Sequence, residues 1–247
     1  MFAPSVLAGS AARCASLCAA LCLAVPVAAQ DTSVARYTIT VSGLTAGRMT
    51  LAANHDGAGY ALTSNAASAG LAGLFRSFSL TTRAQGRDRG GELVPERYSS
   101  QSEGARAGRG AELTFQDGLA TVVSAAASRP DAPLVDPAEH RGAVDPLTGF
   151  YAVLRDVVPE TACRLDLRMF DGHRISRVTL SQPVPGEGGL TCQGVYRRID
   201  GYPPQDLAER ATFPFVLRYT AGADGRLRVA EVSMDSLFGP ARMIRDE

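Results

Sequence analysis

The 247-residue sequence contains no lysine, and this absence excludes several chemistries. Walker-A phosphate loops, pyridoxal Schiff bases and Ser-x-x-Lys acylation centres all need a lysine side chain. Its 25 basic residues are therefore all arginine, and 25 carboxylate residues balance them. A chain without excess positive charge lacks the electrostatic footprint that attracts nucleic acid or an anionic membrane. We therefore expect no nucleic-acid partner.

Histidine is also scarce, and the usual catalytic motifs are missing. His55, His140 and His173 each lie beside a predicted turn, outside any His-Glu-x-x-His pattern, so surface positions are expected for all three. The chain has no Gly-x-Ser-x-Gly elbow for a nucleophilic serine. Asp166 alternates with two leucines, which predicts a solvent-facing carboxylate. The sequence thus predicts no catalytic residue, no metal site and no cofactor, and we expect a protein that is not an enzyme.

Residues 1–29 have the pattern of a secretory signal peptide. Arg13 precedes an apolar stretch over residues 15–25, Pro26 ends that stretch, and small residues follow up to Ala29. Cleavage after Ala29 would leave Gln30 as the mature N-terminus. The apolar stretch is shorter than the about 20 residues that span a bilayer, although a retained anchor is the alternative interpretation. We expect a periplasmic mature protein with no transmembrane segment.

The cysteines divide between the predicted leader and the mature chain. Cys14, Cys18 and Cys22 lie in the leader and do not follow the small residue that precedes a lipid-modified cysteine, so we expect no lipid anchor. Cys163 and Cys192 remain, and an oxidising compartment favours a disulfide between them. A redox-active pair is the alternative, but such cysteines are usually two residues apart. A structural disulfide is the better prediction.

Apolar and polar residues alternate along most of the mature chain, which is typical of strands with one buried face. Glycine-containing turns separate these segments at regular intervals, a spacing that favours an antiparallel meander. We found no internal repeat or long linker, so one β-rich domain over residues 30–247 is expected. The predicted strands cover residues 37–42, 49–51, 60–63, 78–84, 93–101, 111–115, 119–124, 163–170, 173–181, 190–200, 213–220 and 226–234.

One segment departs from this pattern and predicts a helix. Asp145 suits the N-cap position, Pro146 suits the first helical position, and Pro159 would stop the helix. An apolar stripe then repeats at helical spacing and consists of Leu147, Phe150, Tyr151 and Leu154. The fold expected is therefore mainly β (α+β): a curved antiparallel sheet or half-open barrel with one covering helix.

A second apolar cluster, Leu71, Leu74 and Phe75, lies in glycine- and alanine-rich sequence. It is predicted either to plug one end of the sheet or to form a flap over an apolar cavity. Together with the four residues of the helical stripe, these three are the candidate lining of a ligand site.

Several short motifs occur in a fixed order along the chain. They are Tyr37-Thr38-Ile39, Gly43-Leu44-x-Ala46-Gly47, Pro95-x-Arg97-Tyr98, Asp145-Pro146-Leu147-Thr148 and Phe170-Asp171-Gly172. Together they resemble the DUF3108 family of exported bacterial proteins. The resemblance runs from about residue 34 to the end of the chain. The family has no known function, so the resemblance implies no catalytic residues. The layout of many strands and one helix also resembles the half-open barrels of LolA/LolB-type envelope carriers, in architecture alone.

Two functions from different classes fit these observations. The first is a periplasmic, non-enzymatic protein that holds an apolar small molecule or a lipidated protein in cell-envelope maintenance; an apolar pocket needs no catalytic group. The second is an envelope scaffold or adaptor that acts through protein–protein contacts, with an exposed patch around Leu237 and Phe238. An empty interior favours the first function, and a packed one favours the second.

Overall fold

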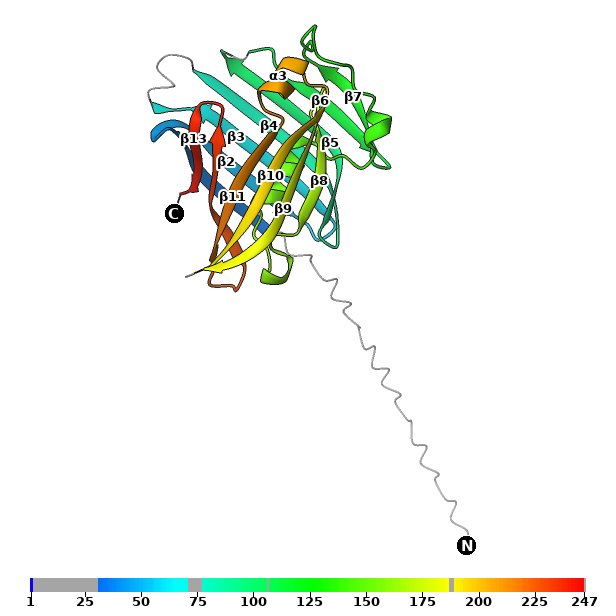
Figure 1. Ribbon diagram of the computed structural model, residues 1–247. Helices are drawn as coiled ribbons and strands as arrows, with labels where there is room; N and C mark the ends of the chain where they lie inside the picture. Colours follow the sequence, from blue (N-terminus) through cyan, green and yellow to red (C-terminus); the bar gives the residue numbers. More distant parts are fainter. Residues whose placement is uncertain (2–30, 71–76, 106, 187–188, 247) are drawn as a thin grey trace.

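The computed structural model describes Met1 and residues 31–70, 77–105, 107–186 and 189–246. Within these residues, thirteen strands form a single antiparallel sheet that curves into a nearly closed barrel (Figure 1). The strands are β1 (Asp31–Val41), β2 (Leu44–His55), β3 (Gly59–Ser68), β4 (Phe78–Arg89), β5 (Glu92–Gly104), β6 (Ala111–Gln116), β7 (Leu119–Ala125), β8 (Leu165–Phe170), β9 (Ile175–Gly186), β10 (Gly189–Asp200), β11 (Thr212–Ala221), β12 (Leu227–Ser236) and β13 (Gly239–Arg245). The predicted β-rich fold is confirmed.

Two meanders make up the sheet. Strands β1 to β7 pair in chain order, strands β8 to β13 do the same, and β13 pairs with β1 to join the two meanders. The two edges of the sheet are therefore β7 and β8, which are consecutive in the chain. In Figure 1 the yellow and orange strands β9 to β11 pass in front of the cyan strands β3 and β4, as expected of a sheet that curves back on itself.

The connection between the two edge strands covers the seam of the barrel. It contains the short 3-10 helices η1 (Pro137–His140) and η2 (Pro159–Thr161) and the helix α2 (Pro146–Leu154). Just before α2, the backbone N–H of Val144 donates to the carbonyl of Arg168 on β8, at 2.9 Å. The N–H of Gly142 donates to the carbonyl of Gly118 in the β6–β7 turn, at 2.7 Å. Backbone groups of both edges thus find partners in the connection.

Helix α2 begins as predicted and ends earlier than predicted. The Asp145 side chain accepts a hydrogen bond from the N–H of Thr148, so Asp145 is the N-cap, and Pro146 follows it. The helix ends at Leu154, well before Pro159, because the chain then becomes extended. Val157 pairs with Leu227 of β12 through two backbone hydrogen bonds of 3.0 and 2.8 Å. A strand partner, not a proline, therefore ends this helix.

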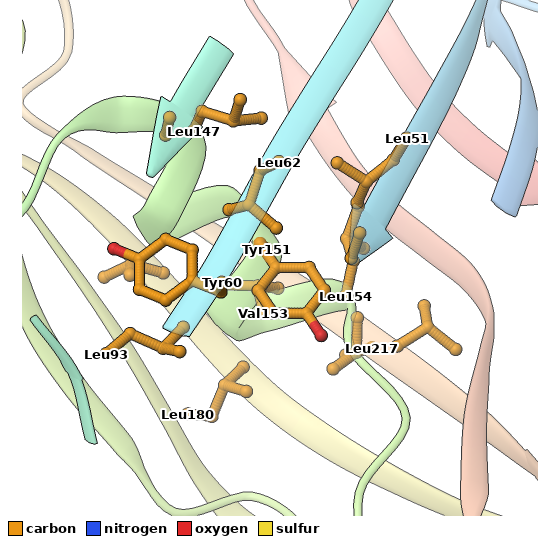
Figure 2. Close-up of a cluster of buried hydrophobic side chains, with 14 of the residues drawn as sticks. Leu51, Tyr60, Leu62, Leu93, Leu147, Tyr151, Val153, Leu154, Leu180 and Leu217 are labelled. Carbon is orange, nitrogen blue, oxygen red and sulfur yellow. The ribbon is translucent and has the colours of Figure 1, made fainter. Parts of the chain in front are cut away.

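The helix packs inside the barrel, against the concave face of β3, β4 and β5 on one side and β8 on the other. Figure 2 shows the resulting cluster, in which Leu147, Tyr151 and Leu154 of α2 lie among side chains from the surrounding strands. Those side chains include Leu51 and Leu62, which are 4% and 2% exposed. Burial of such side chains stabilises the fold by about 1.5 to 3 kcal/mol each.

Two elements near the C-terminus were not predicted. One is the short helix α3 (Pro204–Glu209), which lies between β10 and β11. The other is strand β13, which follows the last two predicted strands, residues 213–220 and 226–234. The sequence predicted only an exposed apolar patch near this point, around Leu237 and Phe238. That patch is the β12–β13 turn, in which Phe238 is 82% exposed. Strand β13 was missed because it is short, contains Pro240, and has two adjacent apolar residues, Met243 and Ile244, that interrupt its alternation.

The predicted disulfide between Cys163 and Cys192 is confirmed. Cys192 lies on β10, and Cys163 lies just before β8, with a Cα–Cα distance of 5.3 Å. Strand β9 separates β8 from β10 in the sheet, so the disulfide ties the end of the connection to the next-but-one strand. Both cysteines are buried. The disulfide thus fixes the point at which the chain leaves the interior and joins the second edge.

Removal of the disulfide is expected to destabilise the barrel. The cross-link closes a loop of 29 residues, and the chain-entropy relation assigns about 3 to 4 kcal/mol to a loop of that length. A Cys163→Ala/Cys192→Ala variant should therefore lose about that much free energy of unfolding in urea titrations. Reduced wild-type protein is the matched control and should behave like the variant. An unchanged unfolding midpoint in both would contradict this role.

Candidate functional site

An apolar cavity of about 450 Å³ lies between α2 and the strands of the second meander. Its volume falls within the range of about 300 to 1,000 Å³ that is usual for small-molecule sites. Only one charged side chain, Asp171, borders it. The lining is Pro146, Gly149, Phe150, Val153, Met169, Asp171, Ser176, Val178, Tyr196, Tyr202, Phe215 and Met234. The chemistry of this lining suits an apolar ligand.

The predicted helical stripe is divided between this cavity and the packed core. Phe150 lines the cavity, whereas Leu147, Tyr151 and Leu154 are absent from its lining and pack toward the first meander (Figure 2). The cavity side of α2 is instead completed by Gly149 and Val153. An apolar stripe shows that a helix face is buried, but it does not distinguish a packed face from one that borders a cavity. The other candidate residues, Leu71, Leu74 and Phe75, lie outside the described residues.

Two glycines let bulky side chains reach the cavity wall. A Cβ at Gly149 would lie 2.4 Å from the sulfur of Met169, so the glycine permits the close approach of α2 to β8. A Cβ at Gly194 on β10 would lie 2.2 Å from the ring of Phe215. The ring therefore lies over the backbone of β10 where another residue would have a side chain. The cavity wall is thus built from close contacts at these two positions.

Methionines border the cavity and continue beyond it. Met169 and Met234 are in the lining. The register places Met243 of β13 opposite Val232 on one side and Ile39 on the other, and all three are partly buried against the core. Methionine side chains are unbranched and polarisable, and they adapt to ligands of varied shape. The concave face beside the cavity therefore presents an adaptable apolar surface.

A buried polar chain fixes the N-terminal end of α2. The fully buried Asp145 accepts hydrogen bonds from the backbone N–H of Thr148 at 2.8 Å and from its hydroxyl at 2.6 Å. Because the Thr148 hydroxyl gives its hydrogen to Asp145, the Tyr60 hydroxyl donates to Thr148, over 2.9 Å. Burial raises the pKa of the Asp145 carboxyl to about 6, against the lowering effect of the hydrogen bonds from Thr148. This chain anchors the helix to β3.

A second polar contact fixes the other end of the helix. The ring Nε2 of His55 on β2 lies 2.8 Å from the hydroxyl of Tyr151. Together with the hydrogen bond between Tyr60 and Thr148, this contact joins α2 to the β2–β3 hairpin at two positions along the helix. These contacts hold the helix against the first meander, so the cavity lies on the opposite side of the helix.

The histidines do not occupy the surface positions that were expected. His55, His140 and His173 are all half-buried, and His140 lies 3.2 Å from the Asp200 carboxylate. Position beside a turn misled this prediction, because burial depends on distant partners: His55 contacts Tyr151 of α2, and His140 contacts Asp200 at the end of β10. Asp166 is exposed as predicted and forms an ion pair with Arg177. Among the described residues, no group of histidine, cysteine or carboxylate side chains is arranged to hold a metal ion.

A larger hollow of about 600 Å³ follows the seam near β8, and its lining has a different character. Arginines and carboxylates of opposite charge border it, including the paired Arg177 and Asp166. Its four arginines outnumber its two carboxylates, and a lining so rich in charge does not suit an apolar ligand. The apolar cavity is therefore the better candidate for a ligand site.

Comparison with known proteins places this chain among proteins of unknown function. The family model described as "Protein of unknown function (DUF3108)" matches residues 36–187, whereas the motifs predicted a match to the end of the chain. No curated protein matches the chain. One solved structure with a similar fold is a beta-barrel-like protein of domain of unknown function DUF1849 from Brucella abortus. It shares 13% identity, covers 87% of this chain and 95% of that one, and has a TM-score of 0.47.

The polar chain at Asp145 predicts a pH-dependent stability. Because folding raises the pKa of this acid from 3.8 to about 6, its contribution to the free energy of unfolding is greatest below pH 4 and falls as the pH rises to about 6. The raised pKa corresponds to a loss of about 3 kcal/mol over that interval. Urea unfolding of the wild type and an Asp145→Asn variant between pH 4 and 7 should show this loss only in the wild type.

The exposed acid Asp166 provides the control for that measurement. An Asp166→Asn variant leaves the buried carboxyl in place and should keep the wild-type loss of stability between pH 4 and 6. Parallel pH profiles for the wild type and Asp145→Asn would show that Asp145 does not titrate in this range.

Proposed function

The chain belongs to the DUF3108 family of proteins of unknown function, and we propose that it is a periplasmic binding protein for an apolar ligand. The apolar cavity between α2 and the second meander carries this proposal, because it is lined by aromatic rings, methionines and aliphatic side chains. Removing apolar surface from water contributes about 25 cal/mol per Å². A lining of this kind therefore binds by burial and needs no reacting group.

The ligand class is an acyl chain, either of a small molecule or of a lipidated protein. An acyl chain has no polar group along its length, and the side chains deep in the cavity likewise offer few hydrogen bonds. The hydroxyls of Tyr196 and Tyr202 are bonded to each other at 2.9 Å. Their mutual bond leaves the rings to provide the contact surface. We propose that the protein acts by binding and not by catalysis, in maintenance of the cell envelope.

The proposed location in the periplasm has two lines of support. The predicted leader over residues 1–29 has the features of an export signal, and the disulfide is of a kind that persists in oxidising compartments. No helix among the described residues is long and apolar enough to cross a membrane.

A second candidate function is supported by the β12–β13 turn. Phe238 is 82% and Leu237 is 40% exposed there, which is unusual for large apolar side chains that neighbour each other. A scaffold or adaptor would use this turn for contact with another protein. The two functions differ in the part of the molecule that acts, since the turn lies at one end of β12 and β13 and the cavity lies between α2 and the second meander.

Filling the cavity should abolish binding without loss of stability. Met234 is a partly buried lining residue, so a Met234→Trp substitution places a large ring in the cavity. Titration with the fluorescent apolar probe 1-N-phenylnaphthylamine should show saturable binding to the wild type and at least a tenfold weaker binding to the variant. Thermal unfolding should show that the variant remains folded.

Ser233→Trp is the matched control, because Ser233 lies opposite Val216 on the outer face of the same strand. It adds the same ring outside the barrel and should leave probe binding unchanged. Equal binding by all three proteins would place the probe outside the cavity and would contradict the proposed function.

A further inference from the structure

Building on the binding function proposed above, we propose that the ligand is a single-chain amphiphile with an anionic head group, bound in a cationic hollow beside the apolar cavity. This hollow has a volume of about 590 Å³ and lies between the strands β4 to β6 and the loops around residues 126–132, 171–174 and 201–203. It is distinct from the apolar cavity in chemistry, and three arginines border it: Arg109, Arg129 and Arg174.

The two spaces adjoin each other at the N-terminal end of α2. Pro146 and Asp171 belong to both linings. Tyr202 borders the apolar cavity, whereas its chain neighbours Gly201 and Pro203 border the cationic hollow. One molecule can therefore extend from one space into the other, with an apolar part beside Phe150 and a polar part beyond Asp171.

The charges of the hollow favour an anion. Arg129 is already paired with Asp131 at 2.8 Å and Asp206 at 3.1 Å, so its charge is offset. Asp171 is the only carboxylate in the lining, and one of its oxygens accepts the backbone N–H groups of His173 and Arg174, at 2.9 and 2.7 Å. These bonds hold the carboxylate toward its own turn. Within the part of the chain that the structure describes, no carboxylate forms an ion pair with Arg109 or Arg174, so these two charges remain for a ligand.

Arginine is well suited to binding an anionic head group. Its guanidinium group binds a carboxylate or phosphate through two parallel hydrogen bonds. Arg174 lies over the ring of Tyr202, with 5.4 Å between the guanidinium carbon and the ring centroid, which positions a cation beside a residue of the apolar lining. The same ring thus connects the apolar and cationic regions. A neutral amphiphile would leave the hollow without a matching group.

The test compares three ligands that share a twelve-carbon chain: laurate, dodecyl phosphate and 1-dodecanol. Each competes with 1-N-phenylnaphthylamine for the purified, delipidated protein. Laurate or dodecyl phosphate should displace the probe at concentrations at least about tenfold lower than dodecanol, and 0.5 M salt should reduce this preference. The stronger of the two anions identifies the head group as a carboxylate or a phosphate.

An Arg109→Gln/Arg174→Gln variant should remove the preference by weakening the anions alone. Binding of dodecanol should stay within about twofold of the wild type, which also shows that the variant is folded. If the double variant unfolds, the single Arg109→Gln variant replaces it in the test, because the Arg109 side chain is exposed. This variant should lose part of the preference for anions. Arg83→Gln, on the outer face of β4, is the control and should bind all three ligands like the wild type.

The outcomes separate this inference from the function on which it rests. If dodecanol binds as tightly as the anions, or if the arginine substitutions leave the preference intact, the head-group site is wrong and the apolar cavity remains. If none of the three ligands displaces the probe, the proposed binding function itself fails.

Discussion

The fold depends on the connection between β7 and β8, which crosses the concave face of the sheet. The chain builds the first meander outward from β1 to β7, and it must then reach β8 at the opposite edge before it can return to β13. The residues between the edges cross the concave face and carry α2 with them. A curved sheet needs apolar material on that face, and the helix supplies it. The same residues also give hydrogen-bond partners to both edges at the seam.

This crossing divides the interior into two unequal parts. Polar contacts from Tyr60 and His55 hold α2 against the first meander, where Leu147, Tyr151 and Leu154 complete a packed core. The opposite side of the helix packs against the edge strand β8 of the second meander, and the apolar cavity lies beyond this contact, between α2 and strands β9 to β12. The cavity therefore follows from the way in which the helix is anchored.

The local features of this fold were predictable from the sequence, because they depend on neighbouring residues. The alternation around Tyr37 and Ile39, the N-cap at Asp145 and the turn at Asp171 all have local causes. Features that depend on distant partners were not predictable. The pairing of Val157 with Leu227 ended the helix early, and the burial of His55 depends on its contact with Tyr151 of the helix.

Only part of the candidate site was predictable from the sequence, for the same reason. The sequence identified Phe150 as a lining residue together with three residues that belong to the core, because all four share one helical stripe. It could not identify Met169, Met234 or Phe215, which come from three strands that meet only in the folded barrel. The positive charges were equally hidden, since Arg109 and Arg174 are far apart in the chain and lie among many other arginines.

Native mass spectrometry of protein purified without detergent from the envelope of its own cells shows whether the barrel carries an apolar ligand. The expected mass is that of the mature, disulfide-linked chain plus one apolar compound, which is released when the protein is unfolded. Repeated observation of the bare polypeptide mass, in protein that also fails to take up added acyl compounds, would contradict the proposed binding.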